Sequence, residues 1–473
     1  MERNALKNPY LPQLVSELFM YHEANALDAF ALYMYGVVLK EFQKSPATTS
    51  HRATLIDGLQ IPDAQSIFIE SIIKFPYNWS AWLDLSELCV GDPSIHSAVE
   101  DQLKPISSHW MYHFFCVNVF LENQANENAI MVIDRLMQGT DEESNGFFVQ
   151  SPYLQSQLAV AHYNMRDFDT AQNHFVMLAK NNSHRLDQMD VYSNILYVKE
   201  DRVGLSQLAH RAVKIDKYRP ETCCIIGNYY SLKSQHEKAV QYFQRALKLD
   251  RTYLSAWTLM GHEYLEMKNT AAAIEAYRRA VDINPRDYRA WYGLGQTYEI
   301  MNMLLYALFY YRKAVELRPY DARMWCAMGG CYLGLERRND AIRSYERAVS
   351  NNDAEGIATK KLATLYREDG NSEQAARCYM RHLELRYQAQ TNQSFQDEEV
   401  AVGSIINLVH VDAPEAEALL YLAYFHRDHK DLEMASMCCS RLLEYPGPEK
   451  EEGKALLREI RSRMDQKGRK KGY

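Results

Sequence analysis

The sequence lacks the features of a membrane, secreted or nucleic-acid-binding protein. It has no run of eighteen apolar residues and no positively charged, then apolar leader after Met1, so it predicts neither a membrane span nor a signal peptide. The formal net charge of −8 argues against general binding of nucleic acid. The chain is therefore expected to be intracellular.

Motifs for catalysis and metal binding are also missing. None of the nine cysteines forms a CxxC pair, which favours buried free thiols over metal or redox chemistry. The histidine pairs His109/His113 and His426/His429 lack a third ligand, and the glycines of residues 292–298 lack the third glycine of a dinucleotide loop. With no GxSxG, P-loop or kinase motif, the sequence predicts no enzyme, no metal and no cofactor.

What the sequence does contain is a repeat of 34 residues across positions 153–386. A small residue recurs at Ala159, Ser193, Gly227, Gly261, Gly295, Gly329 and Ala363. Twelve residues later come Ala171, Leu205, Ala239, Ala273, Ala307, Ala341 and Ala375, and an aromatic residue follows at Phe175, Phe243, Tyr277, Tyr311, Tyr345 and Tyr379, with Ala209 as the exception. Trp257, Trp291 and Trp325 precede three of the glycines by four residues, and Pro285 and Pro319 close two units.

This pattern is typical of tetratricopeptide repeats, each a pair of antiparallel helices. The small residue lies where the two helices of a pair cross most closely, and the alanine and aromatic of the second helix fill the space toward the next pair. One pair cannot bury its own apolar face, so the pairs must stack. We therefore predict an all-α fold, a right-handed superhelical solenoid.

The domain organisation follows from where the repeat holds and where it weakens. We expect an N-terminal entry helix, then irregular repeats that serve assembly or dimerisation, then seven regular repeats, then an acidic polar insertion, then a last repeat, and finally a capping helix with a basic tail. The corresponding ranges are residues 1–29, 30–150, 151–386, 387–414, 415–448 and 449–473.

First-helix positions that point away from the helix pair are the candidate functional residues, because the fold does not need them. One position past the small residue stand Asn194, Asn228, His262 and Gln296, and Asp187, Asp190, Glu221, Glu263, Glu266, Tyr292 and Glu299 flank them. Amides can bind the backbone of an extended peptide and carboxylates can pair with its arginine or lysine. This predicts a groove for a basic or arginine-containing peptide; the alternative is that these residues only solvate the inner helices.

Several stretches that no repeat rule demands resemble one family. The stretches similar to the subunit-eight family of the anaphase-promoting complex, or cyclosome, are residues 33–40, 215–219, 221–232, 234–239, 256–264, 286–300 and 451–458. The resemblance implies a non-catalytic scaffold in a ubiquitin ligase that controls mitosis, found in the nucleus and cytoplasm. It also implies contacts with other tetratricopeptide subunits and homodimers through N-terminal repeats, some of which the family carries upstream of this chain's first residue.

The resemblance further implies that the groove binds a short arginine-bearing motif of the activator subunit. Carried onto this sequence, that groove falls on Asn228, His262, Glu263, Gln296 and Glu299. The alternative is a chaperone-docking adaptor, which captures a C-terminal carboxylate with lysines and arginines. Its inner wall would be basic, whereas here only Arg289 and Arg323 interrupt acids and amides.

Overall fold

The computed structural model describes residues 8, 10–43, 55–56, 59–60, 62–89, 93–138, 148–351, 353, 355–391, 406 and 411–470. The predicted acidic insertion therefore lies largely outside the described residues, as does the end of the basic tail. Among the described residues, no helix is both long enough and apolar enough to cross a membrane.

The described chain divides into two compact units, residues 1–233 and 234–473, and each is described by itself. In the first unit the elements are α1 (Leu11–Glu23), α2 (Ala29–Gln43), β1 (Leu55–Ile56), β2 (Leu59–Gln60), α3 (Ala64–Lys74), α4 (Trp79–Cys89), α5 (Pro93–Leu103), η1 (Lys104–Ile106), α6 (Trp110–Glu122), α7 (Asn126–Gln138), α8 (Pro152–Asn164), α9 (Phe168–Asn181), α10 (Met189–Val198), α11 (Arg202–Ile215) and α12 (Pro220–Leu232). The two strands form a two-residue antiparallel ladder, which leaves the class all-α.

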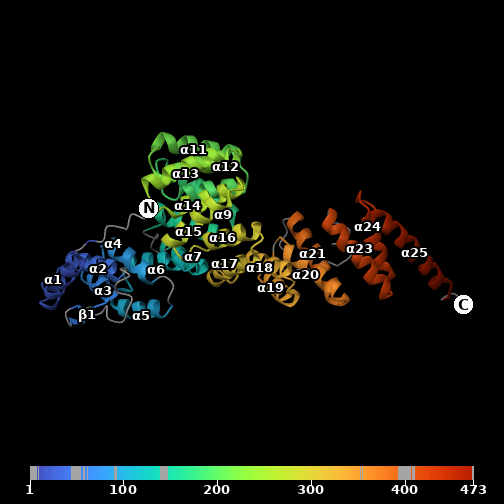
Figure 1. Cartoon of the computed structure of the whole chain (residues 1–473), viewed down its shortest axis with the longest axis horizontal. Helices are drawn as coiled ribbons and strands as arrows, with labels where there is room; N and C mark the ends of the chain where they lie inside the picture. The colour runs from blue at the N-terminus through green and yellow to red at the C-terminus, as the bar shows by residue number, and fades with distance from the viewer. Residues whose placement is uncertain are drawn as a thin grey trace. The chain divides into compact units, whose positions relative to one another are not determined.

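The second unit continues the series of helices. It contains α13 (His236–Leu249), α14 (Leu254–Glu266), α15 (Thr270–Ile283), α16 (Tyr288–Ile300), α17 (Leu304–Leu317), α18 (Ala322–Gly334), α19 (Arg338–Ser350), α20 (Ile357–Glu368), α21 (Ser372–Thr391), α23 (Ala413–Asp428), α24 (Leu432–Leu442) and α25 (Glu449–Lys470). In this unit the helices from α14 to α25 pack in chain order, each pair beside the next (Figure 1). The predicted all-α class is confirmed.

The core of each unit consists of successive hydrophobic clusters, each shared by several consecutive helices. One cluster joins α15 to α20, and the next joins α20 to α25. The recurring alanines of the second helices are completely buried, and the aromatic that follows each is buried too. Burial of such rings supplies most of the stabilisation of each pair, because apolar area removed from water is the dominant favourable term.

The recurring glycines are explained by those aromatic rings. A Cβ atom on Gly261 would lie 2.6 Å from the ring of Tyr277, and a Cβ on Gly295 would lie 2.5 Å from the ring of Tyr311. A Cβ on Gly293, in the middle of the next first helix α16, would also lie 2.5 Å from the ring of Tyr277. Each ring is therefore held between its own first helix and the first helix of the next pair.

The turns within the pairs share one backbone conformation. The residue between the two helices of a pair has a positive φ, and its recurrences are 34 residues apart, at Arg166, Glu200, Ser234, Lys268, Asn302, Glu336 and Gly370. The following amide bonds back to a carbonyl five residues earlier, as in Asn269 N–H to Tyr264 O at 2.8 Å. This is the Schellman arrangement, which satisfies the last carbonyls of the first helix.

The tryptophans of the repeat fix the turns between pairs. The indole N–H of Trp291 donates to the carbonyl of Pro285 at 2.7 Å, and that of Trp325 donates to Pro319 at 2.8 Å. Trp257 bonds in the same way to Arg251, and Trp82 to Pro76. Trp82 is fully buried, whereas the other three rings are only half-buried, so their hydrogen bond is a substantial part of their role.

Candidate peptide-binding wall

The polar wall is made by one face of the first helices. In α16, Arg289, Tyr292, Gln296 and Glu299 lie three or four residues apart, so they share a face of the helix. Gly295, one turn before Glu299, lies at the edge of this face against the ring of Tyr311 of α17. The side chains of this face are half-buried, which leaves them accessible. The candidates before residue 234 belong to the first unit and those after it to the second, so the two parts are described separately.

In the first unit the predicted amide ladder forms a hydrogen bond within the protein. The side-chain amide of buried Asn228 donates to Asn194 Oδ1 at 2.7 Å and to Ser193 Oγ at 2.8 Å. Both donors of Asn228 are thus already used. Asn228 therefore joins α10 to α12, and at 2% exposure it is covered by the protein.

The acids of the first unit interact with other groups of the protein. Arg219 donates to Asp187 at 2.7 Å and to Glu221 at 3.3 Å, and Asp190 is 5% exposed. Arg219 thus pairs within the protein with the same carboxylates that were expected to pair with a basic residue of a bound peptide. Its pKa is raised because these hydrogen bonds and the two negative charges outweigh desolvation.

Glu263 corrects the prediction, because it does not face the open wall. It is 5% exposed, and its Oε2 lies 2.8 Å from Nδ1 of His236 on α13. The physical reason is helical geometry: Glu263 follows His262 by one residue, so it points about 100° around the helix from the wall. Glu263 joins α14 to α13, and Glu266 on the same helix is exposed.

His262 is a wall residue that is held in the neutral form. The hydroxyl of Tyr277 reaches past Gly261 to lie 3.0 Å from Nδ1 of His262. Part of the imidazole is exposed, but the surrounding protein desolvates it, and this together with the positive charge of Arg289 lowers its pKa to about 4. The Tyr277 hydroxyl thus engages Nδ1, and Nε2 is the ring nitrogen left to face a partner.

Glu299 is the carboxylate of the wall that the structure orients best. The hydroxyl of buried Tyr311 donates to its Oε2 at 2.5 Å. Its Oε1 lies 4.0 Å from the position that a Cβ on Gly330 would occupy. Gly330 stands in the next repeat where Gln296 stands in this one, so the ladder lacks a side chain beside this oxygen. The wall therefore has an anchored negative charge next to an open position.

The two arginines of the wall are each held by an aspartate. Arg289 Nε donates to Asp287 at 3.0 Å, and Arg323 Nη2 donates to Asp321 at 3.1 Å. Each aspartate also caps its helix by accepting from the backbone amide of the same arginine. These pairings disfavour a clamp for a terminal carboxylate, because Asp321 already neutralises the charge that the clamp would use.

The sequence analysis missed Tyr277, Tyr311 and Gly330 as residues that shape the wall. A signal was present: the aromatic of the second helix is phenylalanine at Phe175 and Phe243 but tyrosine in the repeats that follow. A phenylalanine would fill the same space, so the added hydroxyl indicates a polar partner. Among the described residues no group of three or more histidine, cysteine or acidic side chains could hold a metal.

A family model and the similar curated proteins point to one family. Residues 1–159 match the model described as anaphase promoting complex subunit 8 / Cdc23, and tetratricopeptide models match residues 220–253, 261–301, 288–321, 322–354 and 358–393. The chain is 44% identical over 451 residues to anaphase-promoting complex subunit 8 of Dictyostelium discoideum, which covers 95% of this chain and 68% of the relative. The chain is also 45% identical over 457 residues to the Arabidopsis thaliana protein of the same name, and this alignment covers 96% of this chain and 70% of that relative.

Among solved structures, the APC/C hetero-tetramer Cut9-Hcn1 has a similar fold. Its TM-score is 0.58 at 15% sequence identity, over 95% of this chain and 82% of that chain. At this identity the likeness concerns the fold alone. Together with the repeat models it confirms the predicted tetratricopeptide class.

Proposed function

Since the chain belongs to the subunit 8 (Cdc23) family of the anaphase-promoting complex, we propose that it is a non-catalytic tetratricopeptide scaffold of that ubiquitin ligase and acts in mitotic progression. The chain offers helix pairs and turns for contact with other subunits. The solved Cut9-Hcn1 assembly supports such partners, because it is a complex built on a similar fold. We further propose homodimerisation through the N-terminal repeats and residence in the nucleus and cytoplasm.

The finer proposal is that the wall of α16 and α18 receives an arginine of the activator subunit. The observation that supports it is Glu299, whose Oε2 is fixed by Tyr311 while Oε1 faces the open position at Gly330. An arginine can form two parallel hydrogen bonds with a carboxylate. Fixing the acceptor in advance lowers the entropy lost on binding. Gln296 and Tyr292, on the same face, can bond the backbone of the bound segment.

The test is the affinity of the full chain for a synthetic peptide that carries the activator's arginine motif. Glu299→Gln keeps the shape but removes the charge, and we expect about tenfold weaker binding, because charged hydrogen bonds contribute roughly 1.5–3 kcal/mol. Glu275→Gln, which removes an exposed carboxylate from the second helix α15, is the matched control and should leave affinity unchanged. If both variants bind like the wild type, or if replacing the peptide's arginine by alanine has no effect, Glu299 is not the receptor.

A further inference from the structure

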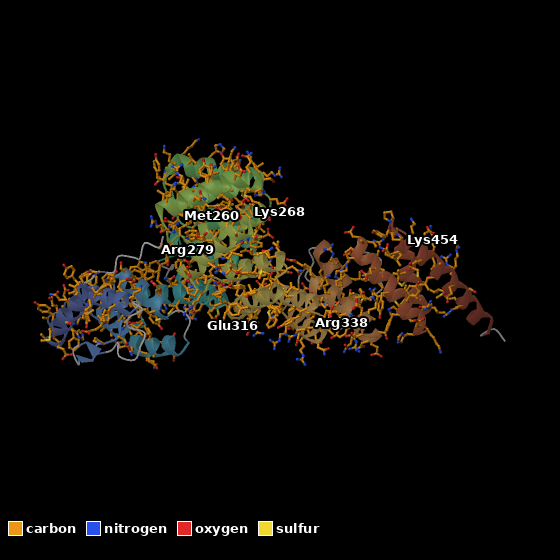
Figure 2. All side chains as sticks on the ribbon, in the orientation of Figure 1. Met260, Lys268, Arg279, Glu316, Arg338 and Lys454 are labelled. Carbon is orange, nitrogen blue, oxygen red and sulfur yellow. The ribbon has the colours of Figure 1, made fainter. Side chains whose placement is uncertain are left out.

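A hollow on another face of the second unit is not explained by the wall. It lies between α18 and α19, has a volume of about 430 Å³, and is lined by Trp325, Met328, Tyr332 and Ser344. These residues belong to a different face of α18 from Arg323 and Gly330, which continue the wall. The hollow is therefore a separate feature with its own aromatic floor. Arg338, at the start of α19, is labelled in Figure 2 and helps to locate it.

The preceding repeat shows what fits such a hollow. Thirty-four residues before Trp325, Tyr332 and Ser344 stand Trp291, Tyr298 and Tyr310. The ring of Tyr310 stacks on Tyr298 with centroids 5.2 Å apart and planes 7° apart, and it stacks on Trp291 at 6.0 Å and 29°. Serine replaces that tyrosine in the next repeat, while the tryptophan and the tyrosine that it would contact are kept.

We propose that the α18–α19 hollow binds an aromatic side chain, tyrosine or phenylalanine, from a partner polypeptide. The bound ring takes the place that Tyr310 takes in the preceding repeat, against Tyr332 and Met328 and beside the hydroxyl of Ser344. Tyr332 and Met328 form the floor of the hollow, and both side chains are otherwise buried. Packing therefore holds them in place before the ring binds. Stacking of this kind is favourable beyond the burial of area alone.

The charges around the hollow favour an acidic residue next to that aromatic. Arg337, Arg343 and Arg347 outnumber the two acids: Asp340 pairs with Arg337 at 2.6 Å, and Glu346 keeps its charge but is held by the hydroxyl of Tyr366 at 2.6 Å. Among the described residues no carboxylate lies within ion-pair distance of Arg343, which is exposed at the rim. Arg347 lies over the ring of Trp325 at 4.8 Å. The partner segment is therefore expected to carry an aromatic residue flanked by aspartate or glutamate.

This site is independent of the arginine groove. It would bind acidic groups where the wall would bind a basic one, and it is lined in part by the second helix α19, whereas the polar side chains of the wall that face a partner lie on first helices. A failure of the Glu299 proposal would leave it untouched. Glu299→Gln consequently serves here as a control variant that should bind the aromatic probe normally.

The test measures binding of a fluorescein-labelled peptide, Glu-Asp-Tyr-Glu-Asp, to the full chain by fluorescence anisotropy. The same peptide with alanine in place of tyrosine is the matched probe and should bind about tenfold more weakly. Ser344→Tyr should fill the hollow with the chain's own ring, as Tyr310 does one repeat earlier, and should weaken binding about tenfold or more. Ser344→Ala keeps the hollow open and should bind within about twofold of the wild type.

Arg343→Gln provides a second test of the hollow, which remains valid if the Ser344→Tyr variant does not fold. It removes one exposed charge and should weaken binding severalfold, with circular dichroism unchanged. Equal affinity for the tyrosine and alanine peptides would overturn the proposal. So would unchanged binding by a folded Ser344→Tyr variant, or the absence of measurable binding at millimolar peptide.

Discussion

At the scale of single residues, the contact between a second-helix ring and a first-helix glycine accounts for much of the repeat. Gly329 and Gly330 are neighbours in α18 with opposite surroundings. A Cβ on Gly329 would lie 2.7 Å from the ring of Tyr345, whereas a Cβ on Gly330 would have its nearest neighbour at 3.9 Å. A side chain at Gly329 would therefore clash with the neighbouring ring, whereas Gly330 has room for one.

Alanine at these two positions should have opposite effects on stability. Gly329→Ala forces the ring of Tyr345 to move and should destabilise its helix pair by about 1–3 kcal/mol. Gly330→Ala adds no clash and removes a helix-interior glycine, so it should stabilise by about 0.5–1 kcal/mol. Hydrogen exchange of α18 and α19 measures both. Equal effects of the two substitutions would contradict the ring contact.

His262 gives a pH prediction at the same scale. Desolvation lowers its pKa to about 4, so the folded state favours the neutral ring. Its contribution to stability is then complete above about pH 6.5 and is lost as the pH falls toward 4. Histidine NMR titration, assigned with His262→Gln, should show this low pKa. Tyr277→Phe removes the hydroxyl that engages Nδ1 and should raise the pKa of His262; a wild-type titration near pH 6.5 would contradict the assigned environment.

At the scale of the element, the positive-φ turn is what lets each first helix reverse into its second. Most of these positions hold residues with a Cβ, for which the left-handed conformation is unfavourable by roughly 1 kcal/mol or more. Gly370 is the exception, with φ of +77° and nothing within 4 Å of an added Cβ. The conformation is therefore imposed by packing of the helices on both sides.

Exchanging residue types at this turn should move stability in a known direction. Lys268, with φ of +59° and labelled in Figure 2, joins α14 to α15. Lys268→Gly should stabilise that pair by up to about 1 kcal/mol, and Gly370→Ala should destabilise α20 and α21 by about 1 kcal/mol. Local hydrogen exchange is the readout, because a repeat array does not unfold in one step. A destabilised Lys268→Gly variant would show that the lysine side chain has a contact that outweighs the strain.

The elements could be predicted far better than the wall. The 34-residue period predicts that Ala273, Tyr277 and Gly261 lie together, because the equivalent residues of every repeat make the same contact. The residues of the wall differ in type from one repeat to the next, so the contacts of one cannot be predicted from those of another. That Asp187 would be used by Arg219, 32 residues away, and that Glu263 would turn toward His236, depends on side-chain geometry in one place. The period specifies the face of a helix, but not which of its charges are already paired.

At the scale of the whole molecule, each unit is built by contacts between neighbouring helix pairs, and 95–96% of the chain aligns with the Dictyostelium discoideum and Arabidopsis thaliana relatives at 44–45% identity. Each pair adds exposed turns and first-helix faces that are not needed for folding. A protein of this kind can present several surfaces at once, here the Glu299 wall and the α18–α19 hollow. This is what a scaffold requires, and it agrees with the family to which the chain belongs.

The most direct test of the account is affinity purification of the tagged chain from mitotic cells, with mass spectrometry of the bound proteins and a ubiquitin-transfer assay on the eluate. The account predicts recovery of other anaphase-promoting complex subunits together with ligase activity, and loss of the activator alone when Glu299→Gln is used. Recovery of chaperones without ligase activity would contradict it, and would mean that the wall serves a different class of peptide.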